Sequence, residues 1–176
     1  DAAVEALATY RGDLDLNGLK KLSDAAADSL CKHKGDLRID DWLETCSDAA
    51  RETLSRKSGT INGEEPEQWA IEQVIRVQQG LSELSDAAAE IISRYEGEEG
   101  LELNALTKLS DTAAEALLRY EGSLGLEGLT ELSDGAAESL AKRQGELCLN
   151  GLTKLSDAAA ESLSKHQGEL VLDGMK

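Results

Sequence analysis

The sequence has no phenylalanine, one proline and only two tryptophans among its 176 residues. Leucine and alanine must therefore fill the hydrophobic core. Basic residues are also scarce, since 18 Lys and Arg stand against 35 Asp and Glu, a formal net charge of −17. Such acidity repels phosphate backbones and anionic membranes, so neither nucleic acid nor membrane is an expected partner. The charge favours basic proteins or cations, although acidity also serves solubility alone.

Long apolar runs and paired cysteines are missing too. No run approaches the roughly 20 residues of a membrane span, and no signal-peptide pattern is present. Cys31, Cys46 and Cys148 form no C-x-x-C spacing and are odd in number, so we interpret them as unpaired thiols. Unpaired thiols favour a reducing, cytoplasmic compartment only weakly. A start without Met and a stop part-way through a repeat indicate a mature product or a piece of a longer array.

What the sequence does contain is a repeat, clearest at residues 147–168, LCLNGLTKLSDAAAESLSKHQG. An aspartate marks its register and opens repeats 1 to 7 in order: Asp1, Asp24, Asp48, Asp86, Asp111, Asp134 and Asp157. The spacing is nearly constant except between repeats 3 and 4, where it is much longer. A period of about 23 residues is typical of solenoids. The continuous repeat predicts one domain over residues 1–176.

Each repeat predicts one helix, as repeat 7 illustrates. Ser156 is a good N-cap, and Asp157 beside it suits the positive end of the helix dipole. Every repeat has Ala two residues after the register aspartate and Leu or Ile six after it, here Ala159 and Leu163. This spacing of four places both on one buried face. The Gly eleven residues after the aspartate, here Gly168, is predicted to end the helix in the left-handed conformation.

Other positions predict an outer face and a strand. Every repeat has an acidic residue four positions after the register aspartate, and six of the seven have a basic residue eight positions after it. This spacing of four predicts solvated ion pairs on the outer face of the helix. Leu-x-Leu segments such as Leu147-x-Leu149 indicate very short strands with one buried face. Leu152 and Leu155 then turn the chain inward. Stacked repeats predict an α/β fold, a right-handed β/α solenoid of seven helices and about seven parallel strands. An all-helical solenoid is the alternative.

The pattern L-x-L-x-x-L-x-x-L-S-D-x-A-A-E-x-L-x-x-x-x-G resembles the leucine-rich repeat, closest to ribonuclease-inhibitor-like repeats, as a bacterial-type variant with Ala-rich helices. It departs from that family where Leu19, Leu129 and Leu152 replace the usual turn asparagine. Arg11 and Gln144 occupy the place of the first consensus leucine. The resemblance implies a protein-binding scaffold without substrate, cofactor or catalytic residues, and hence not an enzyme.

Repeat 3 carries a stretch of extra residues, which we place at 60–74 by aligning Ile75-Arg76-Val77 with Leu37-Arg38-Ile39. Asn62-Gly63 predicts a turn, and the segment from Glu64 to Glu67 predicts a helix opening with proline in its first turn. Trp69 is either an exposed interface anchor or folds back over its own repeat. The second is favoured because large aromatic side chains are mostly buried.

The residues between the strand leucines are predicted to face outward from the sheet, the side that solenoids commonly use for binding. An acidic strip there would receive a basic protein, and Ca2+ is not expected because no EF-hand loop is present. We therefore expect a non-catalytic protein–protein interaction scaffold that binds through the sheet face and the 60–74 insertion. The alternative is a structural spacer or adhesion segment. The residues predicted to contact a partner are Asp15, Arg38, Trp69, Arg76, Glu102, Glu127 and Glu146.

Overall fold

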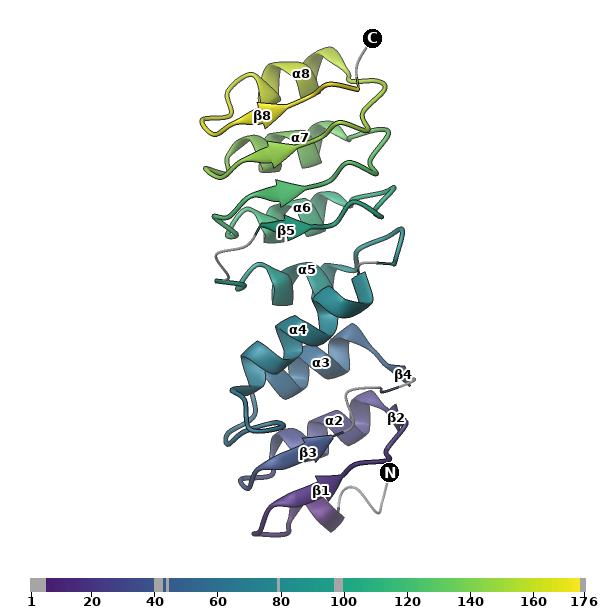
Figure 1. The fold of residues 1–176 in the computed structure, drawn as a ribbon, viewed down its shortest axis with the longest axis vertical. Coiled ribbons are helices and arrows are strands. Elements are labelled where there is room, and N and C mark those ends of the chain that lie inside the picture. Colours follow the sequence, from purple (N-terminus) through teal and green to yellow (C-terminus); the bar gives the residue numbers. More distant parts are fainter. Residues whose placement is uncertain (1–5, 40–42, 44, 79, 97–99, 175–176) are drawn as a thin grey trace. The chain divides into compact units, whose positions relative to one another are not determined.

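The computed structural model describes residues 6–39, 43, 45–78, 80–96 and 100–174. The chain forms two compact units, residues 1–74 (unit 1) and 75–176 (unit 2), and Figure 1 labels the elements of each. Repeats 1 to 3 begin in unit 1 and repeats 4 to 7 in unit 2. The organisation as one functional domain stays a prediction.

Unit 1 contains two small parallel sheets. Its elements are β1 (Leu14–Leu16), β2 (Lys21–Leu22), α2 (Asp24–Cys31), β3 (Leu37–Ile39), β4 (Thr45–Cys46), α3 (Asp48–Ser55) and the greater part of α4 (Pro66–Gln78). Strand β1 pairs with β3, with Leu14 beside Leu37, and helices α2 and α3 pack against each other. The pairing of β2 with β4 was not predicted, because their residues show no Leu-x-Leu pattern.

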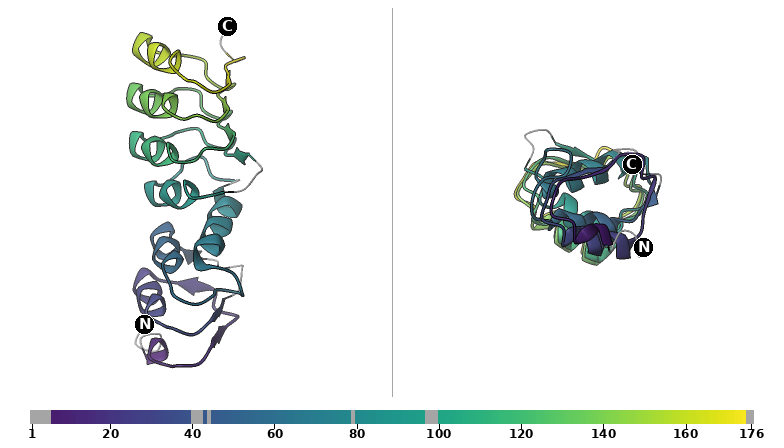
Figure 2. Two further views of the ribbon diagram at one scale, coloured as in Figure 1. Left: turned by 90° about the vertical axis from the view of Figure 1, so that its left-hand side faces the viewer. Right: turned by 90° about the horizontal axis from the view of Figure 1, so that it is seen from below.

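Unit 2 is the more regular of the two. Its elements are α5 (Asp86–Ile92), β5 (Leu101–Glu102), α6 (Asp111–Leu117), β6 (Leu124–Gly125), α7 (Asp134–Ala141), β7 (Leu147–Cys148), α8 (Asp157–Leu163) and β8 (Leu170–Val171). Strands β5, β6, β7 and β8 form one parallel sheet in this order. Consecutive helices pack together, and Figure 2 shows them on one side of unit 2 with the strands on the other. The predicted α/β solenoid of strand–helix units is therefore confirmed.

The predicted helix starts are confirmed, and the Ser-Asp pair does more than cap. In all six described repeat helices the N-cap serine Oγ accepts from the backbone N–H three residues later, at 2.9 to 3.2 Å. In four of these helices the same hydroxyl also donates to the register aspartate of the preceding repeat, as Ser110 does to Asp86 at 2.7 Å. The other three are Ser47 to Asp24, Ser133 to Asp111 and Ser156 to Asp134. In these four repeats the serine caps one helix and ties it to the preceding one.

The predicted core positions are confirmed in repeats 2 to 7. The alanine two residues after the register aspartate is at most 4% exposed, and the Leu or Ile six after it at most 2%. Leu81 stands at the repeat position of Leu152, which is predicted to turn inward, but it is 43% exposed. Its counterparts follow a strand, whereas Leu81 comes directly after α4 and the turn at Gly80, so it does not enter the same turn.

The prediction that the invariant glycines end the helices in the left-handed conformation is wrong for most of them. Helix α7 has its C-cap at Lys142, before Gly145, and among the described members of the set only Gly59 has a positive φ, 83°. At Gly35, Gly59, Gly145 and Gly168 an added Cβ would instead approach the backbone of the preceding repeat, whereas at Gly12 and Gly122 it would meet a tyrosine side chain of the same repeat. A Cβ on Gly145 would lie 2.9 Å from the carbonyl carbon of Gly122 and closer still to its oxygen. The glycine therefore lets two neighbouring backbones meet.

The predicted bounds of the insertion in repeat 3, residues 60–74, are also wrong. Ile75-Arg76-Val77 belongs to α4 and not to a strand. Ile61 occupies the strand place, since it forms a parallel bridge with Leu37, whose N–H donates to the Thr60 carbonyl at 2.9 Å. The insertion therefore lies between Ile61 and Leu81. The sequence shows this in retrospect, because Ile61 stands two positions after Gly59, just as Leu37 stands two positions after Gly35.

The local predictions within the insertion are confirmed. Asn62 and Gly63 have φ values of 55° and 86°, two consecutive left-handed residues as in a type I′ turn. Helix α4 begins at Pro66. Trp69 is 1% exposed, which agrees with the favoured interpretation of a covered side chain.

Candidate functional site

The predicted contact residues outside the sheet of unit 2 lie on two kinds of element, strands and a helix. Asp15 and Arg38 stand side by side in the register of β1 and β3, both exposed, so this sheet face has mixed charge. Trp69 is buried in α4, and Arg76 is exposed in the last turn of the same helix. Neither residue lies on a strand. Arg76 was expected on one only because Ile75-Arg76-Val77 was aligned with Leu37-Arg38-Ile39, and this alignment is wrong.

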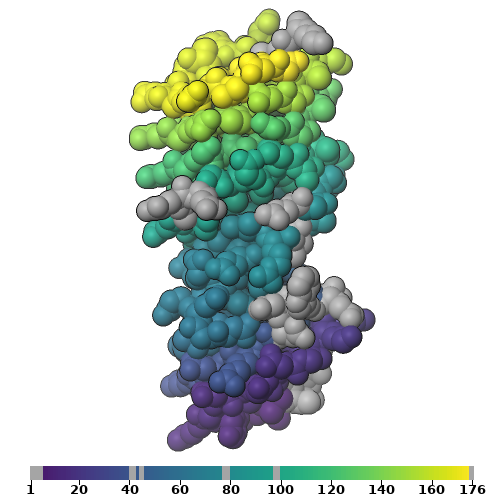
Figure 3. Space-filling model, viewed as in Figure 1, coloured from purple at the N-terminus to yellow at the C-terminus, as the bar shows by residue number. Residues whose placement is uncertain are grey.

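The sheet side of unit 2 faces the viewer in Figure 3, and several acidic residues lie along its strands. The register of β5 to β8 places Glu102, Gly125, Cys148 and Val171 in one row. Neither this row nor the equivalent positions two residues before and two after it contain a Lys or Arg. We call the five carboxylates of these rows the acidic strip: Glu102, Glu127, Glu146, Glu169 and Asp173.

Two asparagines orient carboxylates of the acidic strip. Asn104 donates from Nδ2 to Glu102 Oε2, while its Oδ1 accepts from the backbone N–H of Glu127 at 3.1 Å. Asn150 donates from Nδ2 to Glu127 Oε1 at 3.2 Å, and its Oδ1 accepts from the N–H of Asp173 at 3.1 Å. Asn104 therefore holds Glu102 within one repeat, and Asn150 holds Glu127 of the preceding repeat. Carboxylates held in place in this way lose less entropy on binding.

Cys148 lies among three carboxylates of the strip. Its Sγ donates to Glu146 Oε1 at 3.5 Å, and Ser123 Oγ donates to Glu146 Oε2 at 3.0 Å. Burial raises the pKa of the Cys148 thiol, and the hydrogen bond and negative charge of Glu146, with the charges of Glu127 and Glu102, raise it further. Three of the predicted contact residues, Glu102, Glu127 and Glu146, therefore all raise the pKa of the same thiol on the sheet face.

The reactivity of Cys148 tests this arrangement. Because its raised pKa leaves little thiolate, we expect its alkylation by iodoacetamide at mildly alkaline pH to be slower in the folded chain than in urea. Replacing Glu102, Glu127 and Glu146 together by Gln should accelerate the reaction of the folded protein at least about threefold. Mass spectrometry of the labelled peptide gives the rate. A rate unchanged by the three substitutions, with fold intact, would contradict the arrangement.

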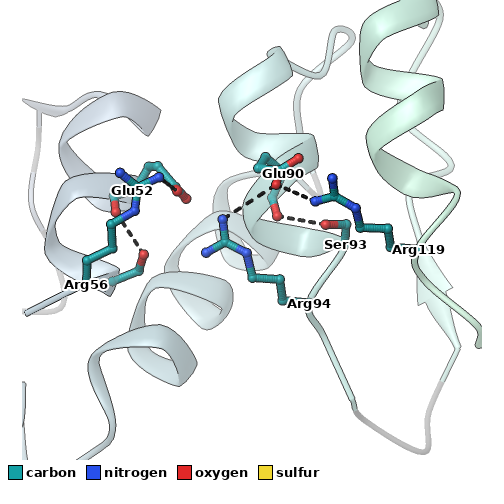
Figure 4. Close-up of polar contacts among 7 residues, drawn as sticks. Glu52, Arg56, Glu90, Ser93, Arg94 and Arg119 are labelled. Carbon is teal, nitrogen blue, oxygen red and sulfur yellow. Dashed lines mark hydrogen bonds and ion pairs between the residues drawn. The ribbon is translucent and has the colours of Figure 1, made fainter.

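The helix side differs because several of its acids are paired with bases. Figure 4 shows Glu52 of α3 with Arg56, and in unit 2 Glu90 of α5 with Arg94 at 3.7 Å and Arg119 at 2.6 Å. The pairs of α7 and α8 are Glu138 with Lys142 at 2.9 Å and Glu161 with Lys165 at 3.0 Å. Four of the six predicted ion pairs are confirmed, whereas Arg119 pairs with Glu90 of the preceding repeat and not with the predicted Glu115. These pairs partly neutralise the acids of the helix side.

Three cavities lie at the C-terminal ends of repeat helices, and one of them, about 620 Å³, is lined by Glu138, Lys142 and Lys165 among others. A smaller one, about 180 Å³, lies between α5 and α6. Within the described residues, no cluster of three or more His, Cys, Asp or Glu is arranged to hold a metal ion. No helix in the same part of the chain is both long and apolar enough to cross a membrane.

Comparisons with models of known protein families, with characterised proteins and with solved structures find no match for this chain. The structure itself defines the class, an α/β repeat protein whose strand–helix units recur with the period of the sequence repeat. Short parallel strands alternate with helices as in leucine-rich repeats.

Proposed function

We propose that this protein is a non-catalytic scaffold of the leucine-rich-repeat type, and that the acidic strip of unit 2 binds a basic segment of another protein. The observation that carries the proposal is the contrast between the two sides of unit 2. Glu90, Glu138 and Glu161 on the helix side each have a basic partner, whereas the sheet-side rows contain five acids and no base. Complementary charge of this kind steers and orients a partner.

The alternative, a structural spacer without a ligand, needs neither feature. A spacer gains nothing from carboxylates held by Asn104 and Asn150. Unneutralised acids in adjacent rows repel one another, and a bound Lys- or Arg-rich segment would relieve that repulsion. Because the strip is exposed to solvent, its contribution should appear mainly in association rate and in salt dependence.

Charge reversal on the strip is the test. We expect the variant with Glu102, Glu127 and Glu146 replaced by Lys to bind a Lys- and Arg-rich peptide at least about tenfold more weakly than the wild type at low salt. The matched control reverses Glu115, Glu138 and Glu161 on the helix side, which gives the same net charge, and should retain most of the binding. Isothermal calorimetry measures both, and circular dichroism confirms the fold.

The outcomes separate the two functions. An equal loss in both variants would mean that only net charge matters and would contradict a defined site. A wild type that binds neither the peptide nor any protein from source-cell lysate would favour the spacer.

A further inference from the structure

We propose that Gly125 is a positioning residue of the acidic strip, because its missing side chain lets the carboxylate of Glu102 lie across strand β6. The proposal rests on the function assigned to the strip and names the residue that brings acids of different strands together. Gly125 itself contributes no charge, so it acts through Glu102.

Gly125 stands inside a sheet, where glycine is unfavourable. Strand β6 pairs with β5 on one side and with β7 on the other. Glycine weakens a strand, and there it often marks the close approach of another group. Its backbone is not in the left-handed region, so conformation does not require glycine. The three heavy atoms nearest to an added Cβ all belong to side chains, so contact between backbones, which explains Gly145, does not require it either.

The side chains that approach Gly125 come from the preceding repeat. An added Cβ would lie 2.8 Å from Glu102 Oε2 and 3.3 Å from its Cδ, and 2.9 Å from Asn104 Oδ1. Asn104 Nδ2 donates to the same Glu102 oxygen, which holds the carboxylate over Gly125. A side chain at residue 125 and the carboxylate of Glu102 therefore cannot occupy this place together.

The register of the sheet shows what the carboxylate approaches from there. Glu102, Gly125 and Cys148 stand side by side on β5, β6 and β7. Neighbouring strands are about 4.8 Å apart, so the backbones at Glu102 and Cys148 are about 10 Å apart. Burial is the main cause of the raised pKa of the Cys148 thiol, and the charge of Glu102 contributes to it across this distance. That contribution agrees with a carboxylate that lies over β6.

Repeats 6 and 7 show that the asparagine bridge alone does not need glycine. Val171 stands at the position of Gly125, and Asn150 at the position of Asn104. Asn150 Oδ1 accepts from the backbone N–H of the next repeat at 3.1 Å, as Asn104 Oδ1 does at 3.1 Å. The difference is that Cys148 stands beside Val171, whereas a long acidic side chain stands beside Gly125. Glycine therefore makes room for the carboxylate.

The position of Glu102 matters for a basic partner. Glu127 and Glu146 also raise the pKa of the Cys148 thiol, so acids of repeats 4, 5 and 6 act on one point of the sheet face. A single Lys or Arg of a bound segment meets all three charges there. A methyl group at residue 125 would push the carboxylate of Glu102 into solvent, where holding it for binding costs more entropy.

The pH profile of Cys148 alkylation by iodoacetamide tests the proposal without any partner. Its midpoint follows the pKa of the thiol, whereas steric hindrance by an added methyl group changes the rate and not the midpoint. We expect Gly125→Ala, Glu102→Gln and the double variant to shift the midpoint to lower pH by the same amount, because each removes one negative charge from the thiol. Glu102→Asp keeps the charge on a shorter side chain and should shift the midpoint in the same direction, which covers a Gly125→Ala variant that fails to fold.

Binding and stability should change in different directions. At low salt, Gly125→Ala should bind the Lys- and Arg-rich peptide about threefold more weakly than the wild type. Its free energy of unfolding should not fall, because alanine is favoured over glycine in a strand and the atoms that must move are the ends of side chains. Calorimetry and urea unfolding measure the two quantities.

Three results would overturn the proposal. The first is a midpoint that Glu102→Gln lowers but Gly125→Ala leaves unchanged, and the second is a midpoint that Glu102→Gln itself leaves unchanged. The third is a shift by Gly125→Ala that is equally large when Glu102 is already Gln, since the glycine would then not act through Glu102. A wild type that binds no basic peptide would contradict the function assigned to the strip, whereas the pH profiles would still decide the role of Gly125.

Discussion

Replacing Gly145 by alanine is expected to lower the free energy of unfolding by about 3 kcal/mol. The added Cβ would lie 2.9 Å from the carbonyl carbon of Gly122 and nearer to the carbonyl oxygens of Glu121 and Gly122. All three atoms are backbone, so no side-chain rotation relieves the clash. Relief requires that repeats 5 and 6 separate, against the pairing of β6 with β7 and the packing of α6 on α7.

Gly80 provides the matched control. A Cβ there would meet nothing within 4 Å, and its backbone is not in the left-handed region. Gly80→Ala should therefore change the free energy of unfolding by no more than about 0.5 kcal/mol. Urea unfolding followed by circular dichroism compares the two. If Gly145→Ala proved as mild as Gly80→Ala, close approach of the backbones would not explain the invariant glycine.

The correct predictions concern features that depend on residues close together in the sequence. The incorrect ones concern features that depend on residues one repeat apart. Ser156 as N-cap, Ala159 and Leu163 as core, and the turn at Asn62-Gly63 depend on neighbours within a few residues, and all are confirmed. The role of Gly145 depends on Gly122, one repeat earlier in the chain. The regular spacing of these glycines indicates that equivalent positions of adjacent repeats are neighbours. It does not indicate how close their backbones come.

The misplaced insertion has a similar cause. Ile75-Arg76-Val77 resembles Leu37-Arg38-Ile39 in residue type, yet α4 begins at Pro66 and continues through it. A strand in a solenoid is defined by pairing with the strand one repeat before it. Ile61 satisfies that condition and Ile75 does not. Spacing from the previous strand is therefore a better guide in this fold than likeness of residues.

The candidate site could be predicted only in part. Alternation around the strand leucines predicted that Glu102 and Glu127 face outward, and both are exposed. It could not predict that Asn150 holds the carboxylate of Glu127, or that Asn104 accepts from the N–H of Glu127, because each of these bonds joins two repeats. Nor could it show that unit 1 presents mixed charge, which depends on the pairing of Asp15 with Arg38.

A second large effect is expected at Arg143, nine residues after the register aspartate of repeat 6. The side chain is 1% exposed and has no carboxylate partner among the described residues. Its Nε and Nη2 donate to the Tyr120 carbonyl at 3.1 and 3.0 Å, and Nη2 donates to the Gly122 carbonyl at 2.6 Å. The guanidinium carbon lies 5.6 Å from the centroid of the Tyr120 ring, which in turn stacks on Tyr95 at 6.2 Å.

Two effects oppose each other when Arg143 is replaced by leucine. Burial disfavours the charge and lowers the pKa of Arg143, so its removal should recover some stability. The same change leaves the Tyr120 and Gly122 carbonyls without donors, at about 1 to 3 kcal/mol each, and removes a cation–π contact worth about 1 kcal/mol. The second effect is larger, and we expect Arg143→Leu to lower the free energy of unfolding by about 3 kcal/mol.

Arg143→Lys separates the hydrogen bonds from the packing. Lys57 occupies the same position in repeat 3 and donates from Nζ to the Gly35 carbonyl at 2.6 Å, the counterpart of Gly122. Lysine can therefore restore part of the network, and its cost should be only about 1 kcal/mol. Arg119→Leu, at a side chain 65% exposed, should cost less than about 1 kcal/mol. If the leucine variant at residue 143 were at least as stable as the lysine variant, relief of the buried charge would outweigh the carbonyl bonds, and this position would serve packing alone.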